Sequence, residues 1–425
     1  MINAIKAAAA NHPRILMAIE WIYIIGSSLL FYAFPQSGML FLVFLSSLLV
    51  IYFMPLNNLI KYLLAAVILC AVMPMIGMQN TYYFDVITQV GIYATLAIGL
   101  NIVVGFAGLL NFGFVAFYAF GAYLYAVFAS SQAANIIPAA IAHFPLSGNW
   151  FWVFLLLSAV LTALLGLLLG FPVLRLRGDY LAIVTLGFAE IIRIVFNNLD
   201  KPINITNGPK GISPIQPPAI FNMVLNQPIH FYFIVLVILV LTIIISRRLD
   251  SSRIGRCWAA VREDELAARS MGVPVVQMKL LAFAIGASFA GMMGVIFAAK
   301  QTFIDPSSFG FMESIGILSM VIVGGMGNIA GVIIGAVGVI MLQLNILKEF
   351  SEYLGQLAAQ GILNIPSQVD PAKYEKMLYG LILILACIYK PQGLLPARRS
   401  LPAWLKGNWR KPNKNGVQEE NTDAT

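Results

Sequence analysis

The sequence is short of charge. Only 10% of its 425 residues are Asp, Glu, Lys or Arg, whereas 60% are hydrophobic. An ordinary soluble domain carries about 25% charged residues, because polar groups have to cover its surface. The composition therefore excludes a soluble enzyme, a disordered regulator and a secreted disulfide scaffold, and it predicts an integral membrane protein.

Groups for metal binding and catalysis are equally scarce. Three cysteines lie far apart, three histidines form no pair, and the dipeptide Gly-Lys of a Walker A loop never occurs. No metal site, disulfide framework or ATP-binding loop is indicated, and nothing places a serine beside a base. We expect a non-enzymatic chain with no cofactor of its own, and such bundles most often move a solute across the membrane.

Long apolar runs are abundant. A helix that crosses about 30 Å of hydrocarbon needs about 20 apolar residues, whereas the strands of a membrane barrel alternate over about 10. We expect an all-α, polytopic bundle of about 10–12 spans. The runs lie near residues 15–34, 39–54, 60–78, 84–104, 113–130, 151–171, 180–197, 231–247, 280–299, 312–324, 329–347 and 376–389.

Basic residues set the orientation. Loop 248–279 and its flanks carry many of them, and cytoplasmic loops collect Lys and Arg. With this loop inside, every other basic cluster also falls inside, so both termini are expected in the cytoplasm. The net charge of +8 then reflects topology rather than nucleic-acid binding. Residues 397–425 are expected to form a basic, disordered cytoplasmic tail.

The cytoplasmic loop predicts a short surface helix. Residues 258–270 contain good helix formers in an amphipathic pattern. Gly272 suits the left-handed residue that ends a helix, and Pro274 prevents its continuation. On the pattern alone, an anchor at the membrane surface explains this segment.

The same loop resembles the E-A-A-x-x-x-G loop of ABC importer permeases. Ala267, Ala268 and Gly272 match that pattern, whereas Leu266 stands where it has Glu, and the acidic residue comes one place earlier, at Glu265. Longer segments resemble the LivM-type permeases of branched-chain amino-acid ABC importers. These segments are Asn101–Leu124, Phe171–Asn198, Ile205–Ser213, Val321–Ala336 and Tyr389–Pro396.

The resemblance implies a permease subunit of an ATP-driven importer in a bacterial cytoplasmic membrane. It implies a second, related permease, two cytoplasmic ATPase subunits that hold ATP and Mg²⁺, and an external substrate-binding protein. Residues 56–396 would form the permease domain, after an N-terminal tail and two extra spans in 1–55. The residues expected to couple to an ATPase are Arg262, Glu263, Asp264, Glu265, Ala267, Ala268 and Gly272.

Two glycine-rich stretches, 105–113 and 324–331, indicate breaks in helices. The free ends of broken helices can line a substrate cavity, although close helix packing also explains glycines in a membrane protein. The candidates for the translocation path are Asn111, Thr185, Glu190 and Asn328.

Two ion pairs are predicted. Glu190 and Arg193 are three residues apart and so share a helix face, where pairing lowers the cost of burying either charge. Asp179 is expected to pair with Arg177 at the cytoplasmic edge. For both pairs we favour a structural role over contact with substrate.

Two alternatives stay open. Permeases of urea or short-amide importers are sequence relatives of the LivM type. An ion-coupled secondary transporter would instead need intramembrane carboxylates for the coupling ion. Glu190, with its arginine neighbour, is a poor site of that kind.

Overall fold

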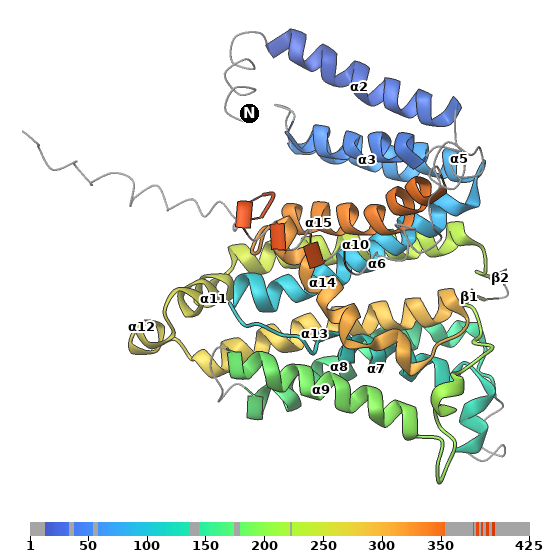
Figure 1. Cartoon of the computed structure of the whole chain (residues 1–425), viewed down its shortest axis with the longest axis vertical. Helices are drawn as coiled ribbons and strands as arrows, with labels where there is room; N and C mark the ends of the chain where they lie inside the picture. The colour runs from blue at the N-terminus through green and yellow to red at the C-terminus, as the bar shows by residue number, and fades with distance from the viewer. Residues whose placement is uncertain are drawn as a thin grey trace, which may run out of the picture.

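The computed structural model describes most of the chain as one bundle of helices that lie side by side (Figure 1). The described residues are 13–33, 38–53, 58–136, 144–173, 179–221, 223–352, 377, 380–381, 384–385, 388–390 and 393–395. The α-helices are α2 (Pro13–Ala33), α3 (Gly38–Phe53), α4 (Asn58–Val67), α5 (Met73–Gly77), α6 (Thr81–Asn101), α7 (Phe114–Phe128), α8 (Phe151–Val173), α9 (Asp179–Asn198), α10 (Pro228–Ser251), α11 (Arg253–Glu263), α12 (Glu265–Ser270), α13 (Val275–Gln301), α14 (Phe311–Gly324) and α15 (Ile329–Met341).

Short π and 3₁₀ turns join or extend these helices. The π turns are η1 (Ile68–Val72), η2 (Ile102–Phe106) and η7 (Leu342–Ile346), and the 3₁₀ turns are η3 (Ser131–Asn135), η4 (Gly148–Trp150), η5 (Gly208–Lys210) and η6 (Pro306–Phe309). A small antiparallel pair, β1 (Ala219–Ile220) and β2 (Met223–Val224), pairs Ala219 with Val224 and Ile220 with Met223. It lies at the end of the bundle opposite α11 and α12 (Figure 1).

The helical, polytopic architecture predicted from hydropathy is confirmed. Within the described residues, seven helices are long and apolar enough to cross a membrane, and four shorter apolar helices accompany them. Each coincides with a predicted run. The remaining run, 376–389, is described only at single positions, and the tail 397–425 lies outside the described residues.

The core is built around α13, which packs most extensively against α7 and α8. Small residues permit this close approach, as is common between helices in lipid. A methyl group on Gly121 of α7 would overlap the backbone of Gly291 on α13, and one on Gly291 would overlap Thr162 of α8. Gly121 therefore serves helix packing rather than a helix break.

The N-terminal helices α2 and α3 join the bundle through an aromatic cluster. The Phe31 ring lies 5.3 Å from Phe41, 5.5 Å from Phe44 and 4.9 Å from Tyr83 at the start of α6, between ring centroids. All four side chains are buried. Aromatic contacts of this kind contribute about 0.5–1.5 kcal/mol each beyond the area that they bury, so α2 and α3 are packed onto the bundle at this end.

Candidate functional site

The basic loop folds as two helices, α11 and α12, so the predicted continuous helix over 258–270 is wrong. The interruption lies at Asp264, whose backbone is extended (φ −154°, ψ 113°). Its Oδ1 accepts the backbone N–H of Leu266 at 2.8 Å and of Ala267 at 2.9 Å. An aspartate that caps a new helix in this way competes with continuation of the preceding one.

The base of this coupling segment, as we call residues 253–272, is fixed by buried contacts. Trp258 is fully buried, its Nε1 donates to the Met278 carbonyl at 2.7 Å, and its ring stacks on Phe106 at 6.4 Å. Lys279 is buried and binds the Glu265 carboxylate at 2.7 Å. The segment is therefore held rigidly against the start of α13 and the end of η2.

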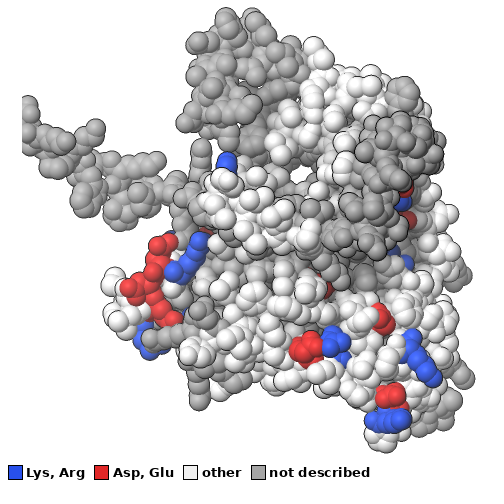
Figure 2. Space-filling model, viewed as in Figure 1, with Lys and Arg blue, Asp and Glu red and all other residues white. Residues whose placement is uncertain are grey.

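The tip of the coupling segment is exposed. Leu266 is 71% exposed and Met271 is 84% exposed, while Ala268 is buried beneath them. Gly272 takes the predicted left-handed conformation (φ 81°), and a side chain there would meet open space. Acidic and basic side chains gather at this end of the molecule (Figure 2). An apolar tip rimmed by charge is typical of a surface that docks another protein.

Arg262 connects the coupling segment to the first glycine-rich break. Its Nη1 donates to the Gly105 carbonyl at 2.5 Å. Gly108 has a positive φ of 73°, and a side chain on it would lie 2.8 Å from Cγ of Arg262. Only glycine combines this backbone conformation with room for the arginine stem. The Arg262 side chain is therefore in direct contact with the backbone of the break.

The two glycine-rich stretches do interrupt helices, and the two breaks meet. The first lies between η2 and α7, and the second between α14 and α15. Asn101 is fully buried, and its Oδ1 accepts the backbone N–H of Gly327 at 2.8 Å. A side chain on Gly105 would overlap both groups. Arg262, Gly105, Asn101 and Gly327 thus form a continuous chain of contacts from the coupling segment to the second break.

Asn328 closes the second break. Its Oδ1 accepts the Ala330 N–H and so caps α15, and its Nδ2 donates to the Leu395 carbonyl, both at 3.1 Å. The Leu395 N–H donates in turn to the Gly324 carbonyl at 3.1 Å. Both the oxygen and the nitrogen of the Asn328 side-chain amide therefore already make hydrogen bonds within the chain.

Asn111 and Thr185, two other path candidates, line one cavity beside the first break. Thr185 Oγ1 accepts the Phe112 N–H at 3.1 Å, and Asn111 Oδ1 accepts the Gly113 N–H at 2.8 Å. Asn111 is 2% exposed, and its Nδ2 has no hydrogen-bond partner among the described residues. The cavity therefore presents an unused donor.

The rest of this cavity is apolar and nearly closed. Its remaining walls are chiefly Phe117, Leu169, Phe188 and Phe283. Its free volume is 10 Å³, close to the minimum of about 10–15 Å³ that one water needs. A solute larger than water can enter only after these walls move apart.

Glu190 does not line this cavity in the described part of the chain. It pairs with Arg193, whose Nε donates to Glu190 Oε1 at 2.9 Å, as the i,i+3 spacing predicts. The two side chains are 38% and 34% exposed, so the pair lies on the surface of the bundle. Asp179 begins α9, but its predicted partner Arg177 lies outside the described residues.

Two polar groups in the bundle lie outside the set of site candidates named from the sequence. One is Asn101, described above. The other is Glu313 in the first turn of α14, whose Oε1 accepts a hydrogen bond from the Tyr93 hydroxyl. Tyr93 lies 12 residues after the start of α6, about 18 Å along the helix, so this carboxylate sits deep in the bundle. The shortness of run 312–324 was the available signal, because so short a helix does not span the membrane.

Comparison with known proteins gives the family. A family model described as "Branched-chain amino acid transport system / permease component" matches residues 82–387. The chain belongs to this family. The "High-affinity branched-chain amino acid transport system permease protein LivM" of Salmonella typhimurium (strain LT2) is 37% identical over 361 residues, covering 80% of this chain and 75% of the relative. LivM of Escherichia coli (strain K12) matches with the same identity and coverage.

A more distant relative is LivH of Escherichia coli (strain K12), another permease protein of a branched-chain amino acid transport system. It is 25% identical over 333 residues, covering 73% of this chain and 94% of LivH. No solved structure matches the chain. The family match includes the coupling segment, the cavity and both breaks, and it begins after α2 and α3.

Proposed function

We propose that this chain is the permease subunit of an ATP-driven importer for branched-chain amino acids. Family membership and the LivM relatives support the substrate class. The observation that carries the mechanism is the hydrogen bond from Arg262 to the Gly105 carbonyl. It joins an exposed surface segment to a helix break inside the bundle.

The chain's partners would supply the energy. ATP and Mg²⁺ bind two separate ATPase subunits, one of which docks on the tip of the coupling segment. Closure of the ATPases moves the tip, Arg262 carries the movement to Gly105, and Asn101 passes it to Gly327. Because packed helices have discrete arrangements, such a small shift can switch the bundle between two openings.

The proposed topology follows from the coupling segment. It faces the cytoplasm of a bacterium, with both termini on that side of the inner membrane, and the external binding protein delivers substrate at the end that carries β1 and β2. Residues 1–55 hold the N-terminal tail and two extra spans, 56–396 the permease domain, and 397–425 a cytoplasmic tail.

The cavity beside the first break is the proposed substrate path. Its phenylalanine and leucine walls suit a branched apolar side chain, and the Asn111 amide suits the carboxylate of an amino acid. Asn328 and Glu190 take structural roles, because the first caps α15 and the second pairs with Arg193.

Thr185→Val is expected to lower uptake about tenfold. It leaves the partly buried Phe112 N–H without its acceptor, and an unsatisfied buried donor costs about 1–3 kcal/mol. The measurement is the initial rate of labelled leucine uptake in cells with matched expression. Thr185→Ser keeps the acceptor and serves as the control, with uptake within about twofold of wild type. Equal rates in the valine variant would contradict this assignment.

A second, related permease is proposed to cover the exposed face of α9. This face carries Ile183 (64% exposed) and Ile191 (58% exposed), with Glu190 and Arg193 beside them near the middle of a membrane span. Charged side chains at that depth are costly when they face lipid and normally face other protein. Contact with a partner subunit therefore explains the partly exposed ion pair.

A photo-crosslinking residue at Ile191 is expected to capture the second permease in membranes. The matched control is Leu168 of α8, which is 68% exposed and carries no neighbouring ion pair in the described structure; there we expect lipid rather than protein adducts. Capture from position 168 but not from 191 would refute this interface.

Purification of the tagged chain from its native membrane tests the proposed function. We expect two P-loop ATPases and a second permease to accompany it in mild detergent. Unlabelled leucine, isoleucine or valine should compete with labelled leucine for uptake, whereas urea should not. If urea alone competed, the proposed substrate would be wrong, and the chain would instead belong to an importer of urea or short amides.

A further inference from the structure

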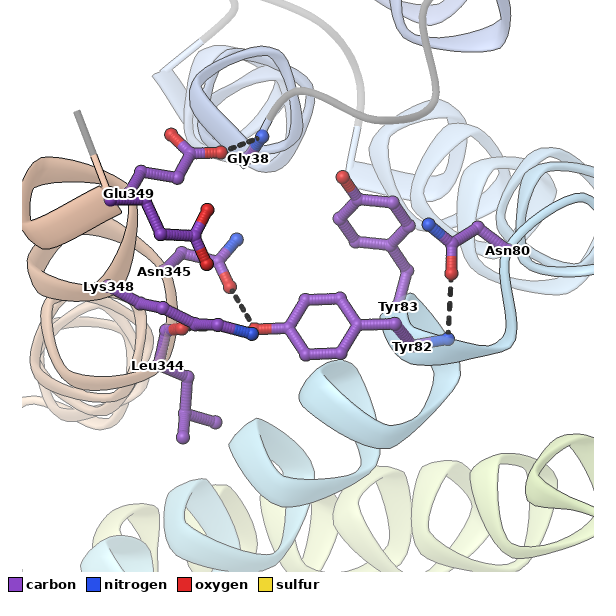
Figure 3. Close-up of a pocket in the computed structure, with 9 residues that line it drawn as sticks. Gly38, Asn80, Tyr82, Tyr83, Leu344, Asn345, Lys348 and Glu349 are labelled. Atoms are coloured by element: carbon purple, nitrogen blue, oxygen red, sulfur yellow. Dashed lines mark hydrogen bonds between the residues drawn. The ribbon is translucent and has the colours of Figure 1, made fainter. Parts of the chain in front are cut away.

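A second cavity lies at the end of the bundle opposite α11 and α12 (Figure 1), and Figure 3 shows it in close-up. The start of α6, the first residue of α3, and η7 with the helical turn 347–352 that follows it enclose the cavity. Its volume is 180 Å³. Since one water needs about 10–15 Å³, this outer cavity has room for a small solute, unlike the closed cavity beside the first break.

Asn345 presents an unused donor in the outer cavity. The residue is 3% exposed, and its Oδ1 accepts a hydrogen bond from the Tyr82 hydroxyl at 3.0 Å. Its Nδ2 is buried without a partner among the described residues. Figure 3 shows this amide between Glu349 and Tyr82, on the wall of the cavity. A ligand acceptor placed here would satisfy a donor that is otherwise costly to bury.

Charges of both signs line the same cavity. The Lys348 ammonium lies 5.3 Å from the centroid of the Tyr82 ring, which holds it in place. Glu349 Oε1 accepts the backbone N–H of Gly38, and a carboxylate keeps further acceptor sites beyond that bond. Glu352 follows one turn later. The cavity thus offers a cation with an amide donor and two carboxylates.

We propose that the outer cavity binds a free α-amino acid with an apolar side chain. Lys348 and the Asn345 amide bind its carboxylate. Glu349 and Glu352 bind its ammonium group, and the rings of Tyr82 and Tyr83 contact its side chain. A metal ion fits poorly, because the lysine repels it and, among the described residues, no group of three or more His, Cys, Asp or Glu is placed so that it could hold a metal ion. This site is separate from the proposed path, and it stands on its own chemistry whether or not the proposed function holds.

The helices upstream of the family match contribute to this site through Gly38. A side chain on Gly38 would lie 2.5 Å from Glu349 Oε1 and 2.9 Å from Asn345 Nδ2. Only glycine therefore leaves both polar groups accessible. The position of α2 and α3, which the aromatic cluster fixes, completes the cavity.

Equilibrium binding of radiolabelled L-leucine to the purified full chain in lipid nanodiscs tests this proposal. We expect Lys348→Met to weaken binding at least tenfold, and Gly38→Val, which fills the cavity, to do the same. Lys348 is exposed, so its replacement leaves the core intact. The matched control is Lys210→Met, at an exposed lysine in η5, and it should bind leucine as wild type does.

Two analogues separate an amino-acid site from a simple ion site. L-Leucinamide lacks the carboxylate and 4-methylpentanoate lacks the ammonium, and each should compete at least tenfold less well than leucine. Leucine binding that is absent in wild type, or unchanged in both Lys348→Met and Gly38→Val, would overturn the proposal. Equal competition by leucinamide would replace it with a site for amines. These experiments measure binding and not transport. Their results can therefore be interpreted even if the chain proves not to be part of an importer.

Discussion

Arg262→Met is expected to uncouple the importer. The variant keeps the length and packing of the side chain but loses the charged donor to the Gly105 carbonyl. Hydrogen bonds to charged groups contribute about 1.5–3 kcal/mol, and a loss of 2 kcal/mol corresponds to about a 30-fold fall in rate. ATP-driven uptake should fall by that factor, while the assembled complex continues to hydrolyse ATP.

Arg256→Met is the matched control for this prediction. Arg256 lies on the same helix, α11, and is exposed, and its guanidinium makes a long contact of 3.4 Å to the Ser251 carbonyl. Its removal should leave uptake within about twofold of wild type, as for most surface substitutions. Hydrolysis and uptake are measured on the same proteoliposomes, so misassembly is distinguished from uncoupling. Wild-type uptake in Arg262→Met would remove this residue from the coupling route.

Gly113→Ala is expected to abolish most uptake. Gly113 stands at the start of α7, where an added methyl group would overlap the Thr185 backbone carbonyl of α9. A side chain could change its rotamer to make room for the methyl group, but the Thr185 backbone cannot. The helices α7 and α9 must therefore move apart. Overpacking of this kind costs about 1–3 kcal/mol, and we expect uptake to fall more than tenfold together with a lower Tm of the purified chain.

Gly316→Ala provides the comparison for this second prediction. Gly316 lies within α14, and an added methyl group there would meet no atom within 4 Å. Alanine also favours helix over glycine by about 1 kcal/mol, so this variant should keep its uptake and its Tm. Full uptake in Gly113→Ala would contradict the close contact between the first break and α9.

The spans and the helix breaks could be predicted from sequence because both are local properties. Run length gives the spans, and glycine-rich stretches mark the interruptions. The Glu190–Arg193 pair is also local, since three residues separate its members. The interruption at Asp264 was local too, but helix periodicity over 258–270 was given more weight than the capping tendency of aspartate.

The contacts between elements could not be predicted in the same way. Arg262 meets Gly105 across 157 residues, and Asn101 meets Gly327 across 226. No periodicity specifies such pairs, because they depend on which helices pack together. The sequence identifies most of the polar residues, but it does not show which of them contact one another. The outer cavity was missed for the same reason, since its residues come from three distant segments.

Uptake of labelled leucine into proteoliposomes that contain the chain with its co-purified partners tests the central claim most directly. ATP and Mg²⁺ on the side of the coupling segment should drive accumulation, and an ionophore that collapses all ion gradients should leave it unchanged. Accumulation that needs no ATP and disappears with the ionophore would contradict the account and identify an ion-coupled carrier instead.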